Sequence, residues 1–251
     1  MKKIKNILRH NIIDKLWPFD WIYGRHACLG YDVLQALKLQ TKLINFQKAR
    51  VDSFIESNCV FYNDELLLEV KRCMPRDDVF GLIVQQQHIF KAPKHPPRFI
   101  LMDSYSELTD QMYRYKKNGW KFFCNSNDLE PSDNFRLNFQ SCGLLPNNKI
   151  RSAYEKYFDY LQMRYPNTPI IFLHIPKMLE ARDYYLERND VIREAISSLA
   201  NDYEFLYPIS IDENVVNWRI DGHGAPDYYP YHYNRETYLS YAESIASLNL
   251  I

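Results

Sequence analysis

The 251-residue chain has no surplus of charge of either sign, because 31 lysine and arginine residues balance 31 aspartate and glutamate residues. Proteins that bind nucleic acids usually carry a basic surplus, so this balance argues against a nucleic-acid partner. The sequence also lacks an apolar run long enough for a membrane-spanning helix, and it has no internal repeat or low-complexity segment. It does not open with the apolar stretch and small-residue cleavage site of a signal peptide. We therefore expect a cytoplasmic protein.

The cysteines are few and irregularly placed, with no CxxC pair among Cys28, Cys59, Cys73, Cys124 and Cys142. An odd number of cysteines without regular spacing indicates reduced thiols rather than a disulfide framework. Neither these cysteines nor the seven histidines show the spacing of a metal site, so no metal is expected.

Aromatic residues are abundant, with 20 tyrosines and 14 phenylalanines. Many of them will lie at the edge of the core, but tyrosine is also suited to stacking against sugar rings. The N-terminal region 1–17 contains a predicted basic amphipathic helix at residues 2–16. Such a helix either packs on its own domain or docks on a membrane surface or a partner, which would make the protein peripheral to the inner membrane.

Short apolar strands alternate with helical segments over residues 18–251, which predicts one α/β domain with a central parallel sheet of about five strands. The expected strands are 19–24, 41–46, 98–103, 169–175 and 204–209, with 120–124 as an edge strand. The expected helices are 31–39, 64–73, 108–117, 149–165, 183–201 and 235–248. Residues 79–84 fit a strand or a buried helix, and insertions at about 58–96 and 126–148 are expected to be irregular.

In an open α/β sheet, ligands bind beyond the carboxyl ends of the strands. The first such loop holds Cys28 between Gly24 and Gly30, directly before a helix. Backbone N–H groups at a helix start lower the pKa of a thiol and stabilise an oxyanion, so Gly24, Arg25 and His26 are candidate binding residues. The alternative is that Cys28 only fills the corner between strand and helix.

A polar cluster follows the strand 98–103, where Ser104 is a candidate nucleophile or oxyanion donor and Ser106 a candidate binding residue. The alternative is an ordinary helix cap. The loop before the last helix holds two histidines, His223 and His232, with Asp221 and Asp227. His232 with one of these aspartates has the composition of a general base and its orienting carboxylate.

The order of these features resembles the SGNH/GDSL hydrolase superfamily, which has a flavodoxin-like three-layer fold. In that family a nucleophile follows the first strand and a D-x-x-H pair precedes the last helix. The chain looks most like a bacterial polysaccharide-biosynthesis branch with G-S-C or G-N-C in place of G-D-S. The resemblance rests on His26-Ala27-Cys28, Tyr31-Asp32, Ala49-Arg50-Val51-Asp52-Ser53 and Tyr231-His232-Tyr233.

Two positions depart from the family pattern, and a second segment resembles the displaced motif. Ala27 stands where serine is expected, which leaves Cys28 as nucleophile, and Asp227 is displaced by two residues from D-x-x-H spacing, which keeps Asp221 a candidate. Met102-Asp103-Ser104-Tyr105-Ser106 resembles a displaced G-D-S motif and makes Ser104 the alternative nucleophile.

The resemblance implies acyl transfer, in particular acetylation of a hydroxyl of a surface or capsular polysaccharide or its precursor. Acetyl-CoA is then the expected donor, no tightly bound cofactor is expected, and Arg25 and Arg50 could hold phosphate groups. A glycan esterase or deacetylase is an alternative within the same fold. A non-catalytic glycan-binding domain, or an accessory of a capsule-assembly complex, is the alternative from another class.

Overall fold

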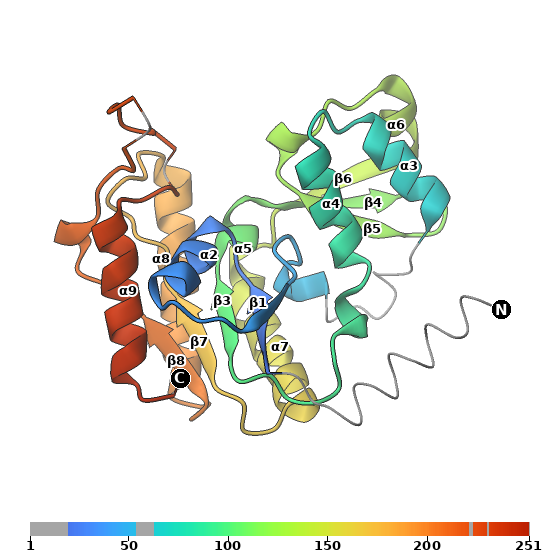
Figure 1. Ribbon diagram of the computed structural model, residues 1–251. Coiled ribbons are helices and arrows are strands. Elements are labelled where there is room, and N and C mark those ends of the chain that lie inside the picture. The colour runs from blue at the N-terminus through green and yellow to red at the C-terminus, as the bar shows by residue number, and fades with distance from the viewer. Residues whose placement is uncertain (1–19, 54–62, 221–222, 230, 251) are drawn as a thin grey trace.

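The computed structural model describes residues 20–53, 63–220, 223–229 and 231–250. Five parallel strands form the central sheet in the order β2-β1-β3-β7-β8 (Figure 1). This is the flavodoxin-like order, and it confirms the predicted α/β fold class. The strands are β1 (Trp21–Arg25), β2 (Lys42–Asn45), β3 (Ile100–Asp103), β7 (Ile170–Leu173) and β8 (Leu206–Ile209).

The sheet is covered on both faces, which explains why its strands lack polar alternation. All residues of β1, β3 and β7 are buried. Two packed helix pairs flank the sheet (Figure 1): α2 (Cys28–Ala36) with α9 (Arg235–Ser247), and α7 (Ile150–Arg164) with α8 (Asp183–Ala200).

Two segments leave the sheet and build a second lobe around a hydrophobic cluster of their own. We call residues 64–86 and 111–143 the insertion lobe. Its antiparallel sheet has β4 at the centre, between β5 and β6. The elements are α3 (Asp64–Arg72), α4 (Asp77–Gln86), β4 (Gln111–Tyr115), β5 (Lys121–Cys124), α6 (Asp133–Asn138) and β6 (Phe139–Gly143).

The lobe differs from the sequence-based expectations in two places, and it decides between the two alternatives for residues 79–84. The predicted helix 108–117 is wrong: the chain forms the short helix α5 (Tyr105–Thr109) and then strand β4. Pairing on both sides of β4 overrides the local helical spacing. Residues 126–148, expected to be irregular, contain α6 and β6, and residues 79–84 belong to α4. The predicted helix 2–16 lies outside the described residues.

A buried ion pair joins the ends of the central strands. Glu107 and Arg25 are 0% and 1% exposed, and the Arg25 guanidinium donates to both carboxylate oxygens, at 2.7 Å for the shortest contact. The same carboxylate accepts from the Tyr154 hydroxyl at 2.7 Å and from the Val51 N–H at 2.9 Å. One side chain therefore ties β1, α7 and the segment after β2 together.

Removing the charge of Glu107 should destabilise the fold strongly. We expect Glu107→Gln to lower the free energy of unfolding by about 3–5 kcal/mol, because it leaves the buried Arg25 guanidinium without its counter-ion. Urea denaturation followed by circular dichroism measures the change. The control is Glu155→Gln, which removes an exposed i,i+4 pair with Arg151 and should cost less than about 0.5 kcal/mol. Equal effects of the two substitutions would contradict this account.

Glycine is required where the first strand turns into α2. A Cβ atom on Gly30 would lie 2.2 Å from Cγ of His26, whose buried ring packs against the helix at that point. A Cβ atom on Gly24 would lie 2.8 Å from the Asn45 side-chain oxygen. That Asn45 amide pairs with both the N–H and the carbonyl of His26. Both glycines thus serve packing at this corner.

Two glycine-to-alanine substitutions in helices should therefore change the free energy of unfolding in opposite directions. Gly30→Ala should destabilise the protein by about 1–3 kcal/mol, since the His26 ring must move. Gly81→Ala, in the middle of α4 with open space around it, should stabilise by up to about 1 kcal/mol through helix propensity. Urea midpoints of the two variants against the wild type test the contrast, and a destabilised Gly81→Ala variant would argue against the described α4.

Candidate active site

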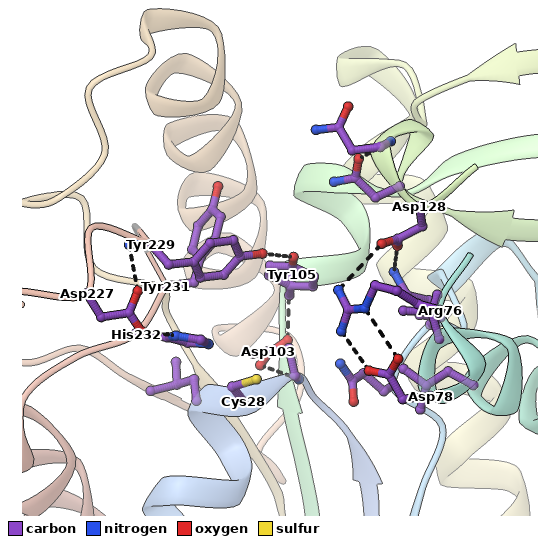
Figure 2. A pocket seen from close by; sticks show the side chains of 18 of the residues that line it. Cys28, Arg76, Asp78, Asp103, Tyr105, Asp128, Asp227, Tyr229, Tyr231 and His232 are labelled. Atoms are coloured by element: carbon purple, nitrogen blue, oxygen red, sulfur yellow. Dashed lines mark hydrogen bonds and ion pairs between the residues drawn. The ribbon is translucent and has the colours of Figure 1, made fainter. Parts of the chain in front are cut away.

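A cavity of about 720 Å³ lies at the carboxyl ends of the central strands, between the sheet and the insertion lobe (Figure 2). This is the position that the α/β topology predicts for a ligand site. Its lining comes from the loops after β1, β2 and β3, from α4 and the turn after β5, and from the loop before α9. Its polar and aromatic lining includes Cys28, Lys48, Arg76, Asp78, Asp103, Tyr105, Asn125, Asn127, Asp128, Asp227, Tyr229, Tyr231 and His232.

His232 and Asp227 form a hydrogen-bonded pair on this cavity. His232 Nδ1 lies 2.7 Å from an Asp227 carboxylate oxygen, and this hydrogen bond holds the pKa of Asp227 below its ordinary value. The contact leaves His232 Nε2 as the nitrogen that can exchange a proton with a ligand. The structure therefore brings together two of the residues predicted from the sequence. His223 is exposed and does not line the cavity, and Asp221 lies outside the described residues.

Cys28 is the first residue of α2, and its exposed side chain lines the cavity (Figure 2). Its pKa is raised above the ordinary thiol value by partial burial and by the carboxylates of Asp32 and Asp103. These effects outweigh the lowering of the thiol pKa that the start of α2 was expected to produce. The resting thiol is therefore protonated at neutral pH, and any nucleophilic role requires a base to remove its proton.

Asp103 ends β3 on the cavity and was not among the residues predicted for the site. One carboxylate oxygen accepts from the Ala27 N–H at 2.8 Å, and the other accepts from the Tyr105 N–H at 3.0 Å. Burial raises the pKa of Asp103 to about 6. A polar residue at the end of an otherwise apolar strand was the sequence signal for it. Because the Ala27 N–H is occupied by Asp103, it is not available to an oxyanion.

Neither candidate serine lines the cavity. Ser104 is 0% exposed, and its hydroxyl has no hydrogen-bond partner among the described residues. Ser106 is buried, and its hydroxyl donates to the Gln47 carbonyl at 2.7 Å. No serine or threonine is among the described lining residues, so among the candidate nucleophiles only Cys28 lines the cavity.

The basic candidates around the first loop are buried and hold the protein together. Arg25 is paired with Glu107, and Arg50 is paired with Asp52 at 2.5 Å and donates to the carbonyls of Asp110 and Gly143. Neither lines the cavity. His26 is also buried, and burial lowers its pKa to about 4. These residues therefore support the loops of the site and do not line the cavity; they are Gly24, Arg25, His26 and Arg50.

Two further walls complete the cavity, and neither was predicted. One is aromatic: the hydroxyls of Tyr105 and Tyr229 lie 2.6 Å apart, and Tyr231 packs edge-on against Tyr105. The other is polar and belongs to the insertion lobe, with Arg76, Asp78, Asn125, Asn127 and Asp128. The sequence could not place this wall, because it comes from the segments that were expected to be irregular.

Among the described residues, no group of histidine, cysteine, aspartate and glutamate side chains has the arrangement of a metal site. No described helix is long and apolar enough to cross a membrane.

No protein-family model matches the chain, and a search of curated proteins finds no match. Among solved structures, the chain is similar to the salicylyl-acyltransferase SsfX3 from a tetracycline biosynthetic pathway, with 10% identity, a TM-score of 0.42 and coverage of 93% of this chain. It is also similar to the acetyl xylan esterase Est2A from the rumen bacterium Butyrivibrio proteoclasticus, with 14% identity, a TM-score of 0.38 and coverage of 92%. The chain spans 55% and 64% of those two chains.

The raised pKa of Cys28 gives a prediction about its reactivity. Alkylation by iodoacetamide at pH 8 should be slower at Cys28 than at a free cysteine, and its rate should rise through pH 9 as the thiolate forms. Asp32→Asn removes one of the carboxylates that raise this pKa, so it should increase the rate at pH 8. Peptide mass mapping follows the modification. Asp133→Asn, in the insertion lobe at the start of α6, is the matched control and should leave the rate unchanged. If the alkylation rate reached half of its maximum below pH 8, the prediction would be contradicted.

Proposed function

We propose that the protein is an acyl-transfer enzyme that uses His232 as general base and Cys28 as nucleophile. The observation that carries the proposal is the His232–Asp227 pair, which shares one cavity with the thiol of Cys28, where the described lining has no serine or threonine. A histidine held by a carboxylate at a ligand cavity is the arrangement that activates a hydroxyl or thiol.

The first step transfers an acyl group to the enzyme. His232 Nε2 takes the proton of the Cys28 thiol while the sulfur attacks the acyl carbonyl carbon. As the bond to the leaving group breaks, His232 returns the proton to that group and a thioester remains on Cys28. Asp227 stabilises the imidazolium that exists between these two proton transfers. Because the resting thiol has a raised pKa, this step depends on the base.

The second step releases the acyl group to an acceptor. His232 removes the proton of an acceptor hydroxyl, whose oxygen attacks the thioester carbonyl, and the departing Cys28 sulfur takes the proton back from His232. The N–H groups of the first turn of α2 have no acceptor within the helix, and they are the donors that the negative oxygen of each tetrahedral intermediate would meet.

The proposed donor is acetyl-CoA, of which only the uncharged acetyl thioester end need enter the cavity, and the proposed acceptor is a hydroxyl of a bacterial surface or capsular polysaccharide or of its precursor. The tyrosine wall supports a sugar as acceptor, since aromatic faces stack on the apolar faces of sugar rings. If water takes the place of the sugar, the same two steps make the enzyme an esterase or deacetylase.

Acyl-enzyme trapping tests the proposal. The protein is incubated with acetyl-CoA or with p-nitrophenyl acetate, and intact mass is measured over time. We expect a gain of one acetyl group that is lost in Cys28→Ala and kept in Cys142→Ala, which removes a partly exposed thiol away from the cavity. His232→Ala should slow the acylation by about 10²–10⁴-fold.

The fate of the adduct separates the two reactions. Decay in buffer alone indicates hydrolysis, whereas decay that requires an added sugar indicates transfer. Turnover without an adduct, lost in His232→Ala but kept in Cys28→Ala, would replace the thioester by direct transfer with the same base. Absence of adduct and of turnover with both reagents would sink the enzymatic proposal and favour a glycan-binding domain.

A further inference from the structure

The part of the cavity that the proposed chemistry does not use lies on the insertion lobe. Figure 2 shows Arg76, Asp78 and Asp128 on one side of the cavity, across from Tyr229, Tyr231 and His232 on the other. Cys28 and Asp103 lie at the floor between these walls. A ligand whose reacting group reached Cys28 and His232 would therefore have the insertion lobe against its far side.

The polar wall is held by ion pairs before any ligand arrives. Lys48 is 4% exposed, and its ammonium donates to Asp128 at 3.0 Å and to Asp110 at 3.1 Å. Burial alone would lower the pKa of Lys48, but these two carboxylates raise it above its ordinary value. Asp128 also lies 4.0 Å from the Arg76 guanidinium. The carboxylate of Asp128 is thus fixed in place on the cavity wall.

Arg76 has a second partner beside the cavity. Its guanidinium donates to both oxygens of Asp78, at 3.3 Å and 2.6 Å. The exposed Arg76 guanidinium, beside the Asp78 and Asp128 carboxylates, offers donors and acceptors side by side. That pattern is complementary to a pair of neighbouring hydroxyl groups, each of which donates and accepts.

The opposite wall offers an apolar face. Tyr229 is 42% exposed, and its hydroxyl is committed to Tyr105 at 2.6 Å, so its ring is held while one part of it remains open. Tyr231 is fixed behind it by a hydrogen bond to Glu180 at 2.9 Å. An aromatic face opposite carboxylates and a guanidinium suits a ring that is apolar on one side and hydroxylated at its edge.

The charges of the cavity lining favour an uncharged sugar over an acidic one. Four carboxylates, Asp78, Asp103, Asp128 and Asp227, line the cavity against the two cations Lys48 and Arg76 among the described residues. Both cations are already paired with carboxylates. An acidic sugar would bring a further negative charge into this excess, which costs binding energy.

We propose that the wall formed by Arg76, Asp78 and Asp128, together with Tyr229, is the acceptor subsite, and that it binds an uncharged sugar ring with neighbouring hydroxyls rather than an acidic sugar. This inference rests on the proposed acyl transfer for its meaning, but sugar binding can be measured without any reaction. The cavity volume of about 720 Å³ is in the range of small-ligand sites and leaves room for more than one ring.

Titration calorimetry with the full chain, in the absence of an acyl donor, tests the subsite. The probes are the uncharged disaccharides maltose, cellobiose and N,N′-diacetylchitobiose, with digalacturonic acid as the acidic counterpart. We expect at least one uncharged disaccharide to bind about tenfold or more tightly than digalacturonic acid at pH 7.5.

Two substitution pairs locate the binding. Tyr229→Ala should weaken binding of the uncharged disaccharide by about tenfold, whereas Tyr229→Phe keeps the ring, loses only the contact with Tyr105 and should weaken binding clearly less than Tyr229→Ala. Arg76→Ala and Arg76→Lys should both weaken it, since lysine lacks the guanidinium fork. The matched controls are Tyr228→Ala and Arg136→Ala, which change exposed residues outside the cavity lining and should bind like wild type.

Failure of the subsite and failure of the proposed reaction give different results. Equal binding of acidic and uncharged disaccharides, no binding of any uncharged probe, or cavity variants that match the controls would each overturn the subsite. Acylation by p-nitrophenyl acetate needs no sugar, so its presence or absence in the wild type judges the reaction separately.

Discussion

The buried pair of Arg25 and Glu107 is the constraint on which the site geometry depends. Arg25 ends β1 three residues before Cys28, and Glu107 lies in α5 four residues after Asp103. Their ion pair therefore fixes the distance between the two loops that form the cavity floor. The hydrogen bond from the Ala27 N–H to Asp103 joins the same two loops a second time, at the cavity. Both connections are buried and charged or charge-assisted, so breaking either leaves a costly unpaired group.

The same floor determines how the thiol could react. Asp103 occupies an N–H group beside the start of α2 and places a carboxylate near the Cys28 sulfur. A helix start favours a thiolate, but nearby carboxylates and partial burial oppose it, and the balance here leaves the thiol protonated. A preformed thiolate therefore does not fit this cavity. Deprotonation during attack does, and in the proposed acylation His232, bonded to Asp227, would supply the base for it.

The sequence predicts the central sheet well, because buried parallel strands are apolar runs bounded by loops, as in Ile170–Leu173. It also predicts His232 with Asp227, since both lie in one loop at the carboxyl edge. It does not predict strand β4, because Leu108, Met112 and Tyr115 have helical spacing and only pairing with β5 and β6 decides the conformation. Nor does it separate the buried Arg25 and Arg50 from ligand-binding arginines, since Glu107 and the carbonyl groups that bury them are distant in the chain.

The segment after β2 explains how the insertion lobe becomes part of the site. Lys48 reaches from this segment to Asp110 and Asp128, and Arg50 donates to the carbonyls of Asp110 and Gly143 at the end of the lobe's sheet where β4 begins and β6 ends. These two cations are 4% and 1% exposed, so their contacts lie in a low-dielectric interior, where loss of a partner strongly destabilises the fold. The lobe is consequently held in one position over the carboxyl edge. A wall built on the lobe then faces the loop of Asp227 and His232 in one arrangement, which the proposed selection of an acceptor would require.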